Sequence, residues 1–262
     1  MPSLLSPRQL KLTLGFLGIL LASSLIAVFG FLAAIPEDPA YHDFAPGTLE
    51  STHIPNSLNV LTNIPFAIVG LYGLVLCIRL RQPFARWSWS FFFIGVGLTS
   101  IGSAAYHWNP TDASLVWDRV PMTIAFASLF AAMLSELIDP NLEKFLLAPL
   151  ILAGISSVVY GYYAEDLRCY GLIQFFPIVA LSLLMLIIRE RYTAGHLLCY
   201  ALLFYMAAKI FEFYDHETWR LIGVGGHPLK HLLASCSTIC LLLRLKRRQA
   251  MLAFGRSVFG NS

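Results

Sequence analysis

The 262-residue sequence has little charge, with Asp, Glu, Lys and Arg making up 13% of it, whereas a typical soluble domain has about 25%. Its basic residues are scattered between apolar runs. Nucleic-acid binding requires a concentrated basic face, so we expect no nucleic-acid partner. We also find no internal repeat and no low-complexity segment. The shortage of charge excludes a soluble globular protein.

Apolar residues are abundant instead, at 57% of the chain, with 19 Phe, 11 Tyr and 5 Trp. A helix that crosses a membrane needs about 20 mostly apolar residues. Eight segments meet this requirement: 12–35, 58–80, 87–107, 118–138, 145–163, 170–188, 194–214 and 227–245. The sequence therefore predicts an all-α, polytopic membrane helical bundle with eight spans.

The connections between these spans are short, except for one segment that is rich in acids and prolines. We divide the chain into an N-terminal membrane span (1–35), an exoplasmic connecting segment (36–57), a seven-helix core (58–245) and a cytoplasmic basic tail (246–262). The first span could instead be a cleaved signal peptide. Its apolar stretch runs from Leu12 to Ala34, longer than the roughly 7–15 residues of a signal peptide, so we expect it to be retained.

Most of the 18 basic residues flank the spans on the side that holds both termini. The positive-inside rule places that side in the cytoplasm. Segment 36–57 and the turns after spans three, five and seven then face the exoplasmic side. Of the five cysteines only Cys169 lies near that face, so no disulfide framework is expected. We expect an integral, multi-pass protein of a bacterial inner membrane, with an endoplasmic reticulum or Golgi membrane as the alternative.

Ionisable groups inside a bilayer are costly, and each one suggests a functional site. Span three ends with Ser103 and His107, span four begins with Asp118, and span eight begins with His227 and His231. The number of spans between these three stretches places all of them in the exoplasmic leaflet at a similar depth. The topology therefore predicts one polar cluster built from distant parts of the chain.

The histidine spacing suggests a metal site. His227 and His231 are four residues apart, so they share one face of a helix, as in the two-histidine motif of zinc proteases. Pro228 follows the first histidine, where that motif has Glu. With His107 as a third ligand, one tetrahedral position remains for water, as in a catalytic zinc site. Asp118 could then act as the general base.

A single histidine at a membrane interface is more often hydrogen-bonded or snorkelling than a ligand. We interpret four histidines in this way: His42, His53, His196 and His216. Three histidines that converge with Asp118 and Ser103 favour a metal site instead. Asp215, near the same end, either reaches this cluster or caps its span.

Other polar residues within the spans are interpreted as structural. Lys209 and Glu212 are three residues apart and can form an ion pair. Glu136 lies at the cytoplasmic end of span four, where a solvated acid is ordinary. Asn59 and Asn63 are interpreted as interhelical hydrogen-bond groups.

The complete set of motifs resembles the alkaline ceramidase family of the CREST membrane hydrolases, over about residues 40–245. The resemblance rests on Ser103-x3-His107, Asp118 eleven residues later, His227-x3-His231, and the flanking Asn59-x3-Asn63, Trp117-Asp118-Arg119 and Leu229-Lys230-His231. The family core has seven helices, so the first span would be an addition to a CREST-like core.

The resemblance implies that His107, His227 and His231 bind zinc, with Ser103 and Asp118 beside it. It also implies hydrolysis of the amide bond of ceramide-type membrane lipids to a fatty acid and a sphingoid base. No obligatory protein partner is evident. Eukaryotic members are similar in fold but carry a calcium site before the first core helix.

The candidate calcium ligands in this chain are Asp43 and Asn56, with Glu50 nearby. An Asn stands where the family has its last Glu, and the sequence has no acid-rich loop of the calcium type. The candidate calcium ligands of this chain therefore depart from the family pattern.

Other functions stay open at this stage. The same superfamily contains receptors and phospholipase-like proteins, so the alternatives are a lipid-responsive receptor or scaffold with a structural zinc, and a phospholipase-like ester hydrolase. A transporter ranks last, because transporters usually show repeated halves and polar sites near the middle of the membrane.

Overall fold

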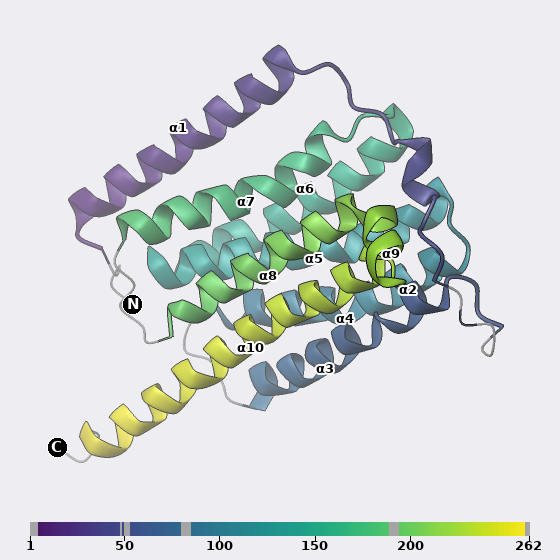
Figure 1. The fold of residues 1–262 in the computed structure, drawn as a ribbon. Helices are drawn as coiled ribbons and strands as arrows, with labels where there is room; N and C mark the ends of the chain where they lie inside the picture. The colour runs from purple at the N-terminus through teal and green to yellow at the C-terminus, as the bar shows by residue number, and fades with distance from the viewer. Residues whose placement is uncertain (1–4, 48, 50–52, 80–84, 189–193, 260–262) are drawn as a thin grey trace.

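The computed structural model describes residues 5–47, 49, 53–79, 85–188 and 194–259, with side chains described as far as Arg248. These residues form a bundle of helices with no strand (Figure 1). The helices are α1 (Pro7–Phe31), the short 3₁₀ helix η1 (Pro39–His42), α2 (Ser57–Leu61), α3 (Ile64–Arg79), α4 (Arg86–Trp108), α5 (Asp112–Leu137), α6 (Leu142–Ala164), α7 (Arg168–Ile187), α8 (His196–Phe213), α9 (Asp215–Ile222) and α10 (Gly226–Phe259).

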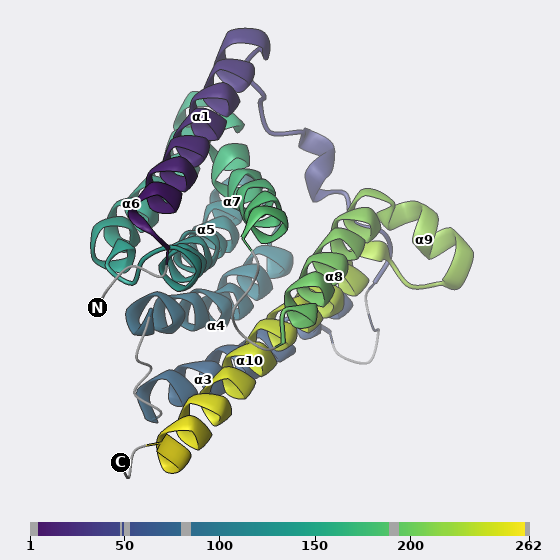
Figure 2. The ribbon, with the colours of Figure 1, turned by 90° about the vertical axis from the view of Figure 1, so that its left-hand side faces the viewer.

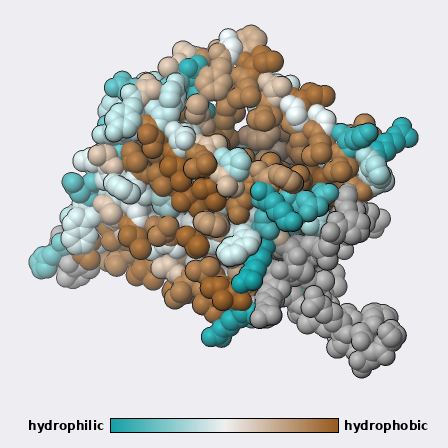
Figure 3. Space-filling model, turned by 180° about the vertical axis from the view of Figure 1, so that it is seen from behind, coloured by the Kyte–Doolittle hydropathy of each residue, from teal (hydrophilic) through white to brown (hydrophobic). Residues whose placement is uncertain are grey.

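Within the described residues, eight helical segments are long and apolar enough to cross a membrane, and α2 and α3 together form one of them. One face of the molecule shows a broad apolar surface with hydrophilic side chains towards its edges (Figure 3). These features confirm the prediction of an all-α, integral, multi-pass membrane protein. The predicted second span differs in one respect, because it is broken between Leu61 and Ile64.

Segments that are far apart in sequence meet at one end of the bundle, called the site end below (Figure 1). The Leu167 amide donates to the Ile35 carbonyl at 2.8 Å, and the side chain of Asn56 donates to the His107 carbonyl at 3.1 Å. The Ala45 amide donates to Asp215 at 2.8 Å. These bonds join the end of α4 and the starts of α7 and α9 to the segment between α1 and α2.

Close packing of α4 on α5 positions the polar cluster at the site end. A Cβ atom on Gly102 would lie 2.1 Å from the Trp117 carbonyl oxygen, so only glycine allows this approach. Helix α5 begins with a capping box in which Thr111 and Ser114 satisfy each other's backbone amides. Ser103 on α4 and Asp118 on α5 are thereby brought side by side.

Helix α1 lies against α6 and α7, away from α3 and α10 (Figures 1 and 2). Its C-terminal end is held by Asp166, which accepts the Ile35 amide at 3.3 Å, and by Arg168, which donates to the Leu32 carbonyl at 2.7 Å. The hydrogen bond from Arg168 holds the pKa of the Asp166 carboxyl below its usual range. A groove of about 590 Å³, lined mostly by apolar side chains, lies between α1, α5, α6 and α7.

A buried ion cluster occupies the opposite end of the bundle. Glu136 is 1% exposed, accepts from Trp89 Nε1 at 2.6 Å and from Arg244 at 2.9 Å, and pairs with Arg248. Our interpretation of Glu136 as a solvated acid was therefore wrong. The local sequence placed it near a membrane face, but cations from α10 bury and neutralise it.

Candidate metal centre

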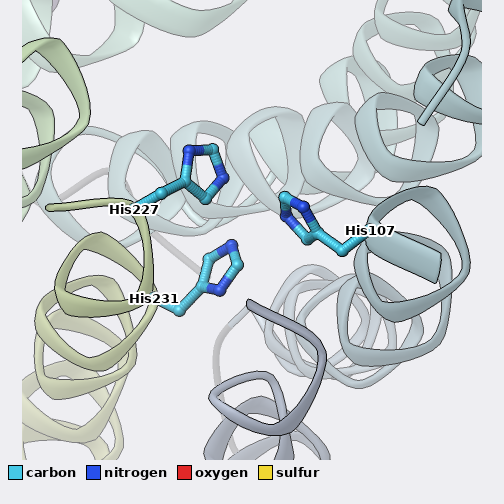
Figure 4. Close-up of side chains that lie close together, drawn as sticks. All are labelled: His107, His227 and His231. Atoms are coloured by element: carbon cyan, nitrogen blue, oxygen red, sulfur yellow. The ribbon is translucent and has the colours of Figure 1, made fainter. Parts of the chain in front are cut away.

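Three histidines converge at the site end (Figure 4). One nitrogen from each of His107, His227 and His231 lies within 4.8 Å of the others. The ring centroids are 4.7 Å apart for His107 and His227, and 5.0 Å apart for the other two pairs. All three side chains are buried. The predicted convergence of α4 and the start of α10 is present in the structure.

The start of α10 is fixed by Asp215, which caps this helix and not the span that Asp215 itself follows. Its carboxylate accepts the His227 backbone amide at 2.7 Å and the Ala45 amide at 2.8 Å. Gly226 allows α10 to begin against α8, since a Cβ there would lie 2.0 Å from the Phe211 carbonyl oxygen. Asp215 therefore acts as a cap that sets the position of His227.

The surroundings of the His107 ring nitrogens fit a metal site. Neither ring nitrogen of His107 has a hydrogen-bond partner among the described residues, although the side chain is fully buried. Buried polar atoms normally have partners. A neutral imidazole nitrogen is a common ligand of zinc, so three buried imidazoles with converging nitrogens suit a divalent ion of this type.

Thr62 determines which nitrogen of His231 can bind a ligand. Its hydroxyl donates to the Leu58 carbonyl at 2.7 Å, so its oxygen is left to accept from Nδ1 of His231, 3.0 Å away. The proton of His231 then lies on Nδ1 and the lone pair on Nε2. Partners of this kind orient metal-binding histidines in many proteins.

Three charged side chains lie beside the histidines. Glu212 pairs with Lys209, as predicted from their spacing, and also with Lys230 at 2.7 Å. The Lys230 ammonium lies 3.3 Å from Nε2 of His227, where it competes for the lone pair. Metal binding through Nε2 of His227 would therefore require this ammonium to move off the nitrogen, and Glu212 offers it another partner.

Ser103 and Asp118 lie together on one cavity of about 150 Å³, which His231 also lines. The Ser103 hydroxyl donates to the Asp118 carboxylate. Both side chains are buried, at 2% and 4% exposed. A carboxylate and a hydroxyl beside converging imidazoles form a set that can move a proton and donate to an oxygen that gains negative charge.

Residues 35–47, called the strap below, cross the site end over this cluster. The Phe44 ring lies 4.7 Å from the His107 ring and 4.8 Å from the His227 ring, measured between centroids. Tyr41 donates to Glu212 at 3.1 Å, and burial raises the pKa of its hydroxyl well above the usual range. The strap therefore closes the histidine cluster with an aromatic ring.

The strap is also tied to α5. Glu37 pairs with Arg119 through two hydrogen bonds. The Arg119 guanidinium lies between the rings of Tyr41 and Tyr170, at 5.3 Å and 4.9 Å from their centroids. Arg119 lines both the 150 Å³ cavity and a second cavity of about 250 Å³, which Glu37 also lines, so this ion pair lies where the two cavities share a wall.

The candidate calcium ligands have other contacts. Asp43 is exposed and its carboxylate lies 3.7 Å from His216. Asn56 donates to the His107 carbonyl, and Glu50 lies outside the described residues. Asp43 and Asn56 thus contact different helices, α9 and α4, and a shared calcium site stays a prediction.

Sequence reasoning missed Thr62 and Phe44. The signal for Thr62 was Pro65, because proline inside a predicted span breaks the helix just before it. No signal marked Phe44, because the course of the strap depends on contacts with several helices that are far apart in the sequence.

Comparisons with known proteins bear on the same region. A family model described as Ceramidase matches residues 49–218, more than half of the chain. The matched segment includes Ser103, His107 and Asp118, and it ends before His227 and His231. No curated protein and no solved structure matches the chain. The family match, together with the polar cluster at the site end, shows that the chain belongs to the ceramidase family.

Proposed function

We propose that this protein is a zinc-dependent hydrolase that cleaves the amide bond of ceramide-type lipids within the membrane, giving a fatty acid and a sphingoid base. One observation carries this function: three buried histidines whose ligand atoms lie within 4.8 Å of one another, beside a cavity that Ser103 and Asp118 line. Membership of the ceramidase family supports an amide lipid as the substrate.

His107, His227 and His231 would hold the metal. When bound, zinc supplies Lewis acidity that makes a water molecule nucleophilic near neutral pH. Asp118 accepts the proton of the attacking water and later returns it to the leaving nitrogen as the C–N bond breaks. The Ser103 hydroxyl rotates from Asp118 to donate to the carbonyl oxygen, and a donor of this kind typically contributes about 10²–10³ in rate.

The test combines metal content and lipid turnover on the detergent-purified protein. We expect one zinc per chain and release of fatty acid from ceramide. His231→Ala should lose both, with turnover reduced by at least about 10³-fold, because a catalytic metal supplies several kcal/mol. His196→Ala is the matched control: His196 is exposed and contacts Arg247 instead of the cluster.

Two other outcomes would contradict this function. Firm zinc binding without hydrolysis of any amide or ester lipid would favour a receptor or scaffold with a structural metal. Hydrolysis of esters alone would favour a phospholipase-like enzyme. A wild-type protein that binds no zinc would overturn the metal site itself.

We also propose that both termini lie in the cytoplasm of a bacterial inner membrane, with the site end facing the exoplasmic side. The distribution of Lys and Arg supports this orientation. Reporter fusions at the C-terminus test it: a reporter active only in the cytoplasm should be active there. Activity of an exoplasmic reporter at the same position would reverse the orientation.

A further inference from the structure

A break in the second span brings two polar side chains to the site end. Helix α2 ends at Leu61 and α3 begins at Ile64. Pro65 explains the break, because it cannot donate to the carbonyl of Leu61 and its ring crowds that carbonyl. Irregular backbone at membrane depth is tolerated where it is buried in protein or lines a cavity. The two residues in the break are Thr62 and Asn63.

The orientation of the Asn63 amide is fixed by a backbone carbonyl. Its Nδ2 donates to the Asn59 carbonyl at 2.8 Å, and a carbonyl oxygen can only accept. The nitrogen must therefore be at that end of the amide, and Oδ1 at the other. Asn63 is 1% exposed, and Oδ1 has no hydrogen-bond partner among the described residues. A buried acceptor without a partner is costly.

Asn63 lines the cavity of about 150 Å³ together with Ser103, Asp118 and His231. Other polar side chains around this cavity already have partners: Ser103 donates to Asp118, Tyr41 to Glu212, Gln174 to Tyr205 and Thr99 to Gly95. Asn63 thus brings to this cavity a neutral, buried acceptor that is fixed in direction and has no hydrogen-bond partner among the described residues.

We propose that Asn63 is a specificity-determining residue whose Oδ1 accepts a hydrogen bond from the amide N–H of the lipid substrate. This inference rests on the proposed function and names the substrate class more closely. The scissile amide carries an acceptor, C=O, and a donor, N–H, on adjacent atoms. The Ser103 hydroxyl donates a hydrogen bond to the C=O, and Asn63 Oδ1 accepts one from the N–H. Esters and tertiary amides lack the N–H, so they leave Oδ1 unpaired.

The experiment compares binding of ceramide with that of its N-methylated analogue, which keeps the chains and hydroxyls but lacks the N–H. Both lipids compete with a fluorescent ceramide for the full-length, metal-loaded protein in detergent. The Asn63→Leu side chain has a similar volume but no acceptor. Any steric penalty that the added methyl group causes in the wild type is therefore also present in this variant. Asn63→Asp keeps an acceptor oxygen. Thr99→Val is the matched control, because Thr99 lines the same cavity with a hydroxyl bonded to Gly95.

We expect the wild type to prefer ceramide by about 10- to 100-fold, the range for a buried group left unpaired. The preference should fall to within about threefold in Asn63→Leu and persist in Asn63→Asp and Thr99→Val. Equal binding of the two lipids by the wild type would overturn the proposal, even if Asn63→Leu fails to fold. An undiminished preference in folded Asn63→Leu would also overturn it.

Turnover is measured separately and distinguishes the two proposals. A wild type that prefers ceramide in binding but hydrolyses no lipid would support the role of Asn63 and contradict the proposed hydrolase. A wild type that hydrolyses ceramide but binds both lipids equally would leave the hydrolase intact and remove the role of Asn63.

Discussion

Buried charges occur at both ends of the bundle, but their surroundings differ. At the opposite end, the Glu136 carboxylate is satisfied by Trp89, Arg244 and Arg248, and these residues line none of the three cavities described above. At the site end, Glu212 is similarly paired, yet both nitrogens of His107 and Oδ1 of Asn63 lack partners among the described residues.

This difference is the reason why we assign the proposed function to the site end. Burial and charge are common to both clusters, so neither identifies the site. Unpaired ligand atoms beside a cavity occur at the site end, where a metal ion and a substrate group can satisfy them. The same kind of substitution should therefore have different effects at the two ends.

Among the four variants compared in this section, Asp118→Asn should have the largest effect on turnover. Loss of a general acid–base typically costs about 10²–10⁴-fold, and the amide keeps the volume and an acceptor for Ser103. We expect zinc content and stability to stay near wild type. Asp112→Asn, at the exposed start of the same helix, is the control. Loss of zinc together with turnover would show instead that Asp118 is a metal ligand.

Glu136→Gln should act on stability instead of turnover. Removing one partner of a buried ion cluster typically costs about 3–5 kcal/mol, because the remaining charges stay buried and uncompensated. The measurement is the free energy of unfolding in detergent, with the exposed Glu217→Gln as control. A folded Glu136→Gln protein with normal stability but no turnover would contradict the structural role that we assign to the ion cluster at the opposite end.

Thr62→Val should weaken metal binding without removing it. The change deletes the Thr62 acceptor of His231 Nδ1–H and leaves only the Asn59 backbone near this ring, and loss of such a partner typically costs about 10- to 100-fold in metal affinity. Thr62→Ser keeps the hydroxyl and should restore most of the affinity. Competition with a zinc chelator measures the affinities. Equal affinities for Val and Ser variants would show that the hydroxyl does not orient His231.

Asp166→Asn should have the smallest effect, and one that depends on pH. Arg168 lowers the pKa of Asp166 in the folded state, so the stabilisation is present above the unfolded pKa of about 3.9 and is lost as pH falls through the lower folded value. The wild type should therefore have the higher thermal midpoint at pH 7, and the difference should shrink at about pH 3. A difference that is constant with pH would rule out this ion pair as its source.

The spans and the histidine cluster follow from the sequence because both depend on local patterns. Apolar runs of the required length determine the spans, and the four-residue spacing of His227 and His231 places them on one helical face. The number of spans between His107 and His227 then brings them to the same end. The structure agrees on the convergence of these three residues, while their roles stay proposals.

Other features depended on contacts that no local pattern records. The burial of Glu136 is produced by Arg244, which lies 108 residues later in the chain. The position of Phe44 over the histidines depends on the course of the strap. The orientation of the Asn63 amide, which leaves Oδ1 without a partner among the described residues, depends on Pro65 and on the Asn59 carbonyl. Spacing alone led us to interpret both Asn59 and Asn63 as interhelical hydrogen-bond groups.

The separation of the three histidines also affects the order in which the protein can mature. His107 belongs to α4, whereas His227 and His231 begin α10. A chain is synthesised and inserted from its N-terminus, so a partly made protein presents only one imidazole of the set. The three-histidine site can exist only after α10 has entered the membrane, and metal uptake would then report that both α4 and α10 are in place.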